Sequence, residues 1–323
     1  MMTGFINTVL RFGRPGKGLF GKFKAYYGTV EAQGRGTLHC HMLIWLDGHP
    51  SLQQLRNKLA SSDEYRDRMF RWLESVIKCE LPGTSEVVQE EPGRPLPRPR
   101  RAEESGNPHP GAVPSPSIKA FDREEDFEAA FDASVTELVR EFNWHEHNAT
   151  CFKYAPKGII PADRTHQDAL CRMRIDGLTC PKTHLDSESG AVLLRRLHPR
   201  IASYDDVVVF MMKCNMDIKS IGSGEAAKAL LYYITDYITK PSLPAHIGLS
   251  ALSYAIQKTN DKHPQGLDNA APGQSRGALT MTVNRMMSRQ EISHQQVMSY
   301  LVGGGDAYTS HTYRVLHWGS FDR

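Results

Sequence analysis

The fold of this chain is decided by one stretch near the N-terminus, Glu31-Ala-Gln-Gly-Arg-Gly-Thr-Leu-His-Cys-His-Met-Leu-Ile-Trp-Leu46. Its second half is rich in residues that favour strands. The sequence Gly34-Arg35-Gly36 is a turn signal that separates this half from an earlier strand-forming run. We therefore predict a β-hairpin within residues 19–47, with strands at residues 23–33 and 37–46.

The predicted hairpin carries a pair of histidines. Side chains alternate along a strand, so His39 and His41 project from the same face. Glu31 and Gln33 share one face of the partner strand, and this turn would set them opposite the histidines. Two imidazoles and one carboxylate or amide oxygen form a three-ligand metal site with open positions for water and phosphate. The alternative is a half-exposed strand face without a metal, and the histidine pair alone does not exclude it.

A pair of tyrosines lies farther along the chain, in Leu230-Leu-Tyr-Tyr-Ile-Thr-Asp-Tyr-Ile-Thr-Lys240. The pattern predicts a helix over residues 223–240, which Pro241 ends. Tyr233 and Tyr237 are four residues apart and stack on one helix face at the edge of the apolar stripe, whereas Tyr232 lies on the more polar side. A tyrosine hydroxyl attacks a phosphodiester once a metal polarises the phosphate. Packing against the core is the alternative role for these rings.

Together the two motifs resemble the Helitron-like Rep domain of the HUH endonucleases, whose name stands for His–hydrophobic–His. The histidine stretch precedes Tyr-Tyr-Ile-Thr-Asp-Tyr-Ile-Thr-Lys, which is the order found in Rep proteins. The resemblance continues through Asn215-Met-Asp-Ile-Lys219 and ends in Glu291-Ile-Ser293 and Tyr308-Thr-Ser-His311. It covers most of the chain outside a Pro-rich segment.

This resemblance implies an α+β fold with an HUH/Rep-like antiparallel sheet flanked by helices, and with extra helical and loop insertions. It also implies single-stranded DNA nicking and joining in Helitron-type rolling-circle transposition. Tyr233 and Tyr237 would attack the scissile phosphate and leave a 5′-phosphotyrosine and a free 3′-hydroxyl. The ligands implied for a divalent ion, Mg²⁺ or Mn²⁺, are His39, His41 and either Glu31 or Gln33.

The resemblance also sets expectations about partners. Single-stranded DNA is the expected partner, with contacts from Arg35, Lys240, Arg172 and Arg174. Family members usually carry a helicase, and none is recognised here, so a helicase would act in trans. Residues 16–22 imitate the start of a P-loop, but Phe23 stands where a Mg²⁺-binding hydroxyl is required, so ATP binding is not expected. The family's work on genomic DNA implies a nuclear protein, and otherwise a cytoplasmic one.

A second group of metal-binding residue types lies in the middle of the chain. His145, His147, Cys151 and Cys171 fall within 27 residues, and neutral imidazoles with thiolates suit a closed four-ligand Zn²⁺ site. We consider a structural zinc here, with Cys180 and His184 as substitute ligands. The alternative is a set of unrelated surface histidines and buried cysteines.

The rest of the sequence predicts the organisation of the chain. Residues 1–90 would form the first half of the Rep domain, residues 91–118 a Pro/Arg-rich disordered insertion, and residues 119–323 the remainder. Further elements are predicted from apolar periodicity and turn signals. They are helices at 51–76, 127–142, 279–287 and 295–301, a buried strand at 206–212 and a loop at 260–276.

Composition narrows the class of protein. The formal net charge of the 323 residues is only +3, so any DNA-binding surface has to be a local basic patch. Six cysteines without dense regular spacing favour reduced thiols or a metal site over a disulfide scaffold. No apolar run is long enough to span a bilayer, so no membrane partner is expected.

Two rival functions remain open at this stage. About 20 residues precede the hairpin, fewer than in the family, which favours a truncated, catalytically inactive DNA-binding remnant of such a transposase. A barrel metallohydrolase is the third reading, but the repeating strand–helix units that it requires are not found.

Overall fold

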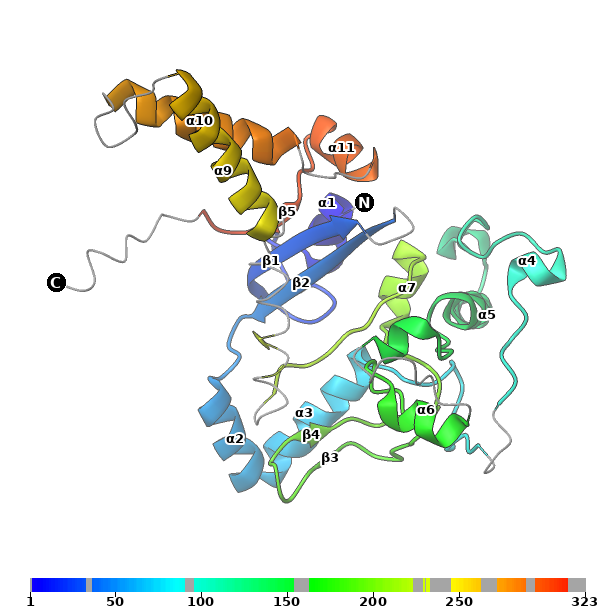
Figure 1. Cartoon of the computed structure of the whole chain (residues 1–323). Helices are drawn as coiled ribbons and strands as arrows, with labels where there is room; N and C mark the ends of the chain where they lie inside the picture. The colour runs from blue at the N-terminus through cyan, green and yellow to red at the C-terminus, as the bar shows by residue number, and fades with distance from the viewer. Residues whose placement is uncertain are drawn as a thin grey trace. The chain divides into compact units, whose positions relative to one another are not determined.

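The structure of the chain is a computed structural model that describes residues 2–32, 37–90, 96–153, 163–222, 229, 231–232, 245–262, 272–288 and 294–312. These residues form helices and small antiparallel sheets, so the α+β class is confirmed (Figure 1). The chain divides into two compact units. Unit 1 consists of Met1–Lys24 and Leu46–Leu230, and unit 2 of Ala25–Trp45 and Leu231–Arg323.

The predicted hairpin strands form a three-stranded sheet with a short strand from the end of the chain. The strand order is β2 (Leu38–Leu46), β1 (Phe23–Ala32) and β5 (Ala307–Thr309). Strands β1 and β5 are antiparallel, with Gly28 opposite Tyr308. A Cβ atom on Gly28 would lie 3.0 Å from Cε of a methionine and 3.3 Å from Sγ of a cysteine on β2. Glycine at this position therefore lets the side chains of β2 cross over β1.

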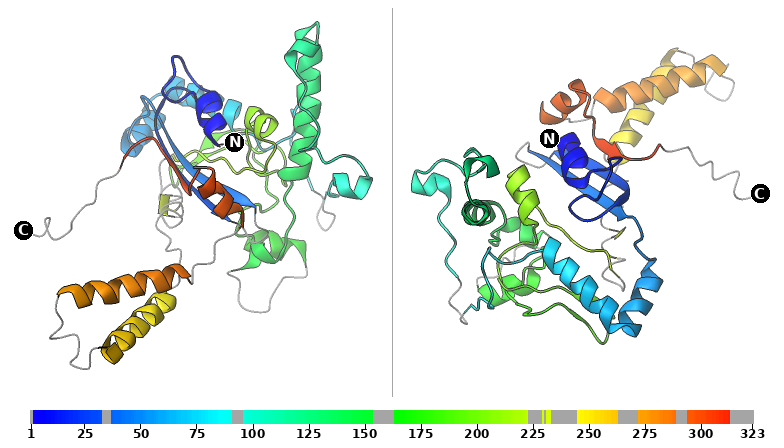
Figure 2. Two further views of the ribbon diagram at one scale, coloured as in Figure 1. Left: turned by 90° about the horizontal axis from the view of Figure 1, so that it is seen from above. Right: turned by 180° about the vertical axis from the view of Figure 1, so that it is seen from behind.

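Two long helices of unit 2 pack side by side. They are α9 (Ala245–Lys262) and α10 (Pro272–Ser288), as Figure 2 shows, and α11 (His294–Leu301) follows. The Arg285 guanidinium lies 3.8 Å from the ring centroid of Tyr254, which joins α10 to α9 by a cation–π contact. The prediction of a loop at 260–276 is wrong at both ends. Helix α9 continues to Lys262, and Pro272 occupies the first position of α10, where a missing N–H is tolerated.

Unit 1 begins with two short helices, α1 (Met2–Gly4) and the π-helix η1 (Phe5–Leu10). After the hairpin, the predicted helix at 51–76 is two helices, α2 (Leu52–Ser61) and α3 (Asp63–Val76). The break between them follows from the serine at position 62, whose hydroxyl accepts a hydrogen bond from a backbone N–H in the first turn of α3. Serine favours this capping position over a helix interior.

A second pair of helices, α5 (Glu124–Phe142) and α7 (Asp206–Met212), encloses an apolar core in unit 1. The fully buried residues of this core include Val139, Ile201 and Val209. The prediction of a strand at 206–212 is wrong. A short apolar run is compatible with either a strand or a helix. The side chain of Asp205 favours the helix, because it accepts a hydrogen bond from a backbone N–H in the first turn.

The described part of the predicted disordered insertion contains a short helix, α4 (Ala102–Ser105). The arginines that precede α4 in this segment contact acidic residues at the end of α5 and after it. Arg98 Nε lies 3.1 Å from a carboxylate oxygen of Glu146, and Arg101 Nη1 lies 3.6 Å from one of Glu141. These ion pairs connect the segment to α5 and to the residues that follow it.

The remaining described elements of unit 1 are short. They are η2 (Ile118–Ala120), η3 (Ala149–Phe152), α6 (Arg164–Leu170), β3 (His184–Leu185) and β4 (Val192–Leu193). Strands β3 and β4 form an antiparallel pair. Within the described part of the chain, no helix is long and apolar enough to cross a membrane.

Candidate metal centres

The first candidate centre lies on the hairpin sheet of unit 2. The ring centroids of His39 and His41 are 4.7 Å apart, as expected for neighbours on one strand face. Nε2 of His41 lies 3.4 Å from Oε1 of Glu31 on β1. The strand pairing therefore brings this carboxylate to the histidines. The arrangement offers two imidazole nitrogens and one carboxylate oxygen to a cation.

The electrostatics of this centre favour a neutral imidazole at His39. Partial burial lowers the pKa of His39, and the neighbouring His41 lowers it further, while Glu31 raises it. A neutral imidazole is the form that binds metals. All three residues are half-buried, so the face that they share remains partly open to solvent.

Several residues of the predicted nuclease site cannot be placed beside this centre. Gln33, Arg35, Tyr233, Tyr237 and Lys240 lie outside the described residues. The neighbouring Tyr232 is described. Its side chain is 78% exposed, which agrees with the polar helix face predicted for it.

The second candidate centre is in unit 1 and brings together the four residues predicted for a zinc site. The nearest ligand atoms of His145, His147, Cys151 and Cys171 all lie within 4.8 Å of one another. Nε2 of His145 is 3.2 Å from Nδ1 of His147, 3.7 Å from Sγ of Cys151 and 3.4 Å from Sγ of Cys171. Both cysteines are buried, and all six thiols of the chain are free.

These spacings fit a tetrahedral metal. Zinc–sulfur and zinc–nitrogen bonds of about 2.3 and 2.0–2.1 Å place tetrahedral ligand atoms roughly 3.3–3.8 Å apart. Burial, together with the neighbouring His147, lowers the pKa of His145 to about 4, so its imidazole is neutral. Burial also raises the pKa of the Cys151 thiol. A bound cation would reverse this last effect, because a coordinating thiol is deprotonated.

Short local structures position these four ligands. Residues 149–152 form η3, whose first turn is capped by the side chain of Asn148. The backbone N–H of Arg172 donates to the carbonyl of Cys151 over 3.1 Å, which ties the two cysteine segments together. The side chains of Arg172 and Arg174 are exposed beside the cluster.

A network of charged residues, which no sequence motif predicts, lies beside the cluster. Nε2 of His147 lies 2.5 Å from Oδ1 of Asp168 on α6. The Arg200 side chain, only 1% exposed, contacts the carboxylates of Asp168 and Glu90. Arg200 hydrogen bonds lower the pKa of both carboxyls against the opposing effect of burial. The proximity of Asp168 to Cys171 in sequence was the one available signal.

The substitute ligands form a separate contact. Sγ of Cys180 lies 3.6 Å from Nδ1 of His184, and neither residue belongs to the four-residue cluster. The four-residue set is therefore complete without Cys180 or His184 as a substitute ligand.

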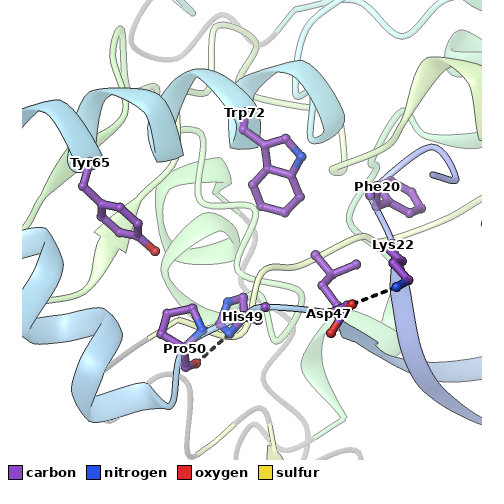
Figure 3. Close-up of a pocket in the computed structure, with 10 residues that line it drawn as sticks. Phe20, Lys22, Asp47, His49, Pro50, Tyr65 and Trp72 are labelled. Atoms are coloured by element: carbon purple, nitrogen blue, oxygen red, sulfur yellow. Dashed lines mark hydrogen bonds and ion pairs between the residues drawn. The ribbon is translucent and has the colours of Figure 1, made fainter. Parts of the chain in front are cut away.

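Unit 1 also has a shallow hollow where the chain leaves β2 and enters α2 and α3. It is lined by ten residues that include Phe20, Lys22, His49, Tyr65 and Trp72. Figure 3 shows the rings of Tyr65 and Trp72 extending from α3 toward the turn that carries His49. Lys22 Nζ lies 3.3 Å from Asp47 Oδ2 at the rim. Aromatic faces and a cation thus line one surface.

The fold and the two centres define an α+β protein with one half-open and one closed cluster of metal-binding side chains. Residues 1–44 match the family model described as the Helitron helicase-like domain at N-terminus. The matched segment contains Glu31, His39 and His41. No curated protein and no solved structure matches the chain.

Proposed function

We propose that this chain is the nuclease portion of a Helitron-type transposase and nicks and joins single-stranded DNA in a metal-dependent reaction. The observation that carries the proposal is the convergence of His39, His41 and Glu31 on one sheet face, inside the segment that matches the Helitron helicase-like domain. Two imidazole ligands and one carboxylate leave open positions for a phosphate oxygen and water.

In this proposal, metal binding and nucleophilic attack are carried out by different residues. His39, His41 and Glu31 hold a Mg²⁺ or Mn²⁺ ion, which polarises the scissile phosphate when it is bound. The hydroxyl of Tyr233 or Tyr237 gives its proton to a base and bonds to phosphorus, while the bond from phosphorus to the 3′-oxygen breaks and this oxygen takes up a proton. The products are a 5′-phosphotyrosine and a 3′-hydroxyl. Joining reverses this step, because a 3′-hydroxyl attacks the phosphotyrosine and releases the tyrosine.

A structural Zn²⁺ at the second centre is part of the proposal. Its four donors are two nitrogens and two sulfurs within 4.8 Å of one another, and this is the ligand set of a closed structural site. A zinc ion there would fasten the segment from His145 to Cys151 onto Cys171. It would also hold Arg172 and Arg174, which we expect to contact the DNA backbone, on one short loop.

The hollow in unit 1 gives the DNA strand a surface. Trp72 and Tyr65 offer ring faces on which bases stack, and Lys22 offers a cation to the phosphates. Stacking tolerates every base, so this surface would hold single-stranded DNA without reading its sequence. A helicase acting in trans would supply that strand, and such work on genomic DNA would take place in the nucleus.

The test is the covalent adduct. The purified chain is incubated with Mn²⁺ and labelled single-stranded oligonucleotides, and the products are separated under denaturing conditions. We expect a protein–DNA adduct that requires the metal and disappears in the Tyr233→Phe/Tyr237→Phe double variant. Tyr232→Phe is the matched control, because this exposed tyrosine lies beside the pair and should leave the adduct unchanged. A folded chain that binds DNA without forming an adduct would instead be an inactive remnant.

A further inference from the structure

The closed cluster of unit 1 is connected to an arginine that is buried with its full charge. The Arg200 side chain is 1% exposed. Its Nη1 and Nη2 lie 2.5 and 2.9 Å from the two oxygens of Asp168, and its Nε lies 2.9 Å from each oxygen of Glu90. Burying a guanidinium is unfavourable unless it is paired and hydrogen-bonded. Such a complete set of partners fixes both carboxylates in position.

The fixed Asp168 carboxylate reaches a ligand of the cluster. Its Oδ1 accepts a hydrogen bond from Nε2 of His147 over 2.5 Å. The other ring nitrogen of His147, Nδ1, lies 3.2 Å from Nε2 of His145, within the ligand set. A neutral imidazole carries one proton. With that proton on Nε2, the lone pair of Nδ1 points toward the metal position.

Arg200 also fixes the second histidine, through its backbone. Its carbonyl accepts a hydrogen bond from the N–H of His145 over 2.8 Å. The next residue, Ile201, pairs with Trp144 in an antiparallel bridge and is fully buried in the core. Arg200 therefore sets the position of His145 by its main chain and of His147 by its side chain, with Asp168 in between.

We propose that Asp168 is the positioning residue of the metal centre in unit 1, and that Glu90 and Arg200 hold it in place. Asp168 selects the Nδ1-binding tautomer of His147, orients its ring and makes the ring a stronger donor to the metal. This inference rests on the zinc centre proposed above. If Asp168 served only to neutralise Arg200, its charge would have no effect on metal affinity.

The test compares zinc affinities of the full chain, measured by competition with a chromophoric chelator. Asp168→Asn keeps the size of the side chain and removes its charge, and we expect zinc affinity to fall about 10- to 100-fold. A ¹H–¹⁵N spectrum of the zinc-loaded wild type should show His147 protonated on Nε2 and metal-bound through Nδ1. That Nε2 proton should exchange faster with water in Asp168→Asn.

Asp163→Ala is the matched control. Asp163 lies at the start of the same helix, α6, and accepts a hydrogen bond from the backbone N–H of His166 over 3.0 Å. The substitution weakens the start of the helix but leaves the contact between Asp168 and His147 in place. Zinc affinity should therefore stay within about twofold of the wild type. An equal loss of affinity in this variant would mean that Asp168 acts only by supporting α6, and would overturn the proposal.

The remaining outcomes separate the two levels of inference. A wild-type chain that takes up no zinc and gives no tetrahedral Co²⁺ spectrum would refute the zinc centre and the role of Asp168 with it. Zinc binding that is as tight in Asp168→Asn as in the wild type would refute only the role of Asp168. If Asp168→Asn does not fold, Glu90→Gln replaces it, with an expected loss of about threefold. Unchanged affinity in Glu90→Gln would overturn the role of Glu90.

Discussion

The two candidate metal centres of this chain differ in how their side chains are supported. In unit 2, His41 contacts one carboxylate at 3.4 Å, and the ligand face is half-buried. In unit 1, the ligand atoms of two histidines and two buried cysteines lie within 4.8 Å of one another. A carboxylate at 2.5 Å orients one of these histidines, and a buried arginine orients the carboxylate.

This difference follows a general division between metal sites. Sites with three protein ligands and open positions carry out chemistry, whereas four closed ligands stabilise a fold. The hairpin face of His39 and His41 fits the first class and the cluster of unit 1 fits the second. Substitutions at the two centres should therefore have different effects. Those at the hairpin centre should reduce catalysis, and those in the unit 1 cluster should reduce stability.

The largest expected effect is the loss of the unit 1 fold. Removal of zinc by a chelator, or the double substitution Cys151→Ser/Cys171→Ser, should lower the Tm of the chain by about 10 °C or more, because metal-binding free energy is folding free energy. Differential scanning calorimetry measures it. Cys180→Ser is the control, since this thiol lies outside the cluster. If the chelator does not shift the wild-type melting curve, the unit 1 cluster is not a structural metal site.

The next effect concerns the hairpin centre. His41→Ala removes a metal ligand that also contacts Glu31, and we expect the Mn²⁺-dependent cleavage rate to fall about 100-fold or more. The Tm should change little, because the ligand face is half-exposed. His294→Ala, an exposed histidine at the start of α11 that does not line the hollow, serves as the control. If His41→Ala cleaved DNA normally while losing stability, the assignment of the two classes would be reversed.

A smaller effect is expected at the hollow of unit 1. Trp72→Leu removes a ring face while keeping an apolar side chain, and should weaken binding of single-stranded DNA about tenfold. Fluorescence anisotropy at fixed salt measures this affinity. Tyr300→Leu replaces an exposed aromatic residue that does not line the hollow, and should bind like the wild type. Equal affinities for Trp72→Leu and the wild type would show that the bases do not stack there.

The smallest effect separates the charge of the unit 1 core from its metal centre. Burial raises the pKa of Asp205 to about 7, well above the value of about 3.9 in an unfolded chain. Between these values the folded state holds a proton that the unfolded state releases, so stability falls as pH rises from about 4 to 7.

The substitution Asp205→Asn tests this prediction. Asparagine can also accept the hydrogen bond from the Val208 N–H at the start of α7. It should stabilise the chain by about 1 kcal/mol at pH 8, and this gain should shrink toward pH 4. Denaturant unfolding of the zinc-loaded protein at several pH values gives the comparison. A constant difference between variant and wild type across this range would contradict the raised pKa.

Local patterns in the sequence were sufficient for much of the fold. The alternation around His39 and His41 and the turn residues before them predicted the strands of the hairpin, and their positions are confirmed. Periodic apolar residues predicted the helices at 127–142 and 295–301. The same reasoning failed at α7, because a seven-residue apolar run carries too little periodicity to distinguish a strand from a helix.

Residue type and spacing alone determined which side chains this protein offers to a metal: the histidine pair on a strand and the four histidines and cysteines of unit 1. Only the tertiary structure decided what surrounds them. Glu90 and Arg200 are 110 positions apart in sequence and contact each other because the core around Ile201 brings their segments together. Strand and helix propensities act over a few residues, whereas the geometry of a ligand set depends on the path of the whole chain.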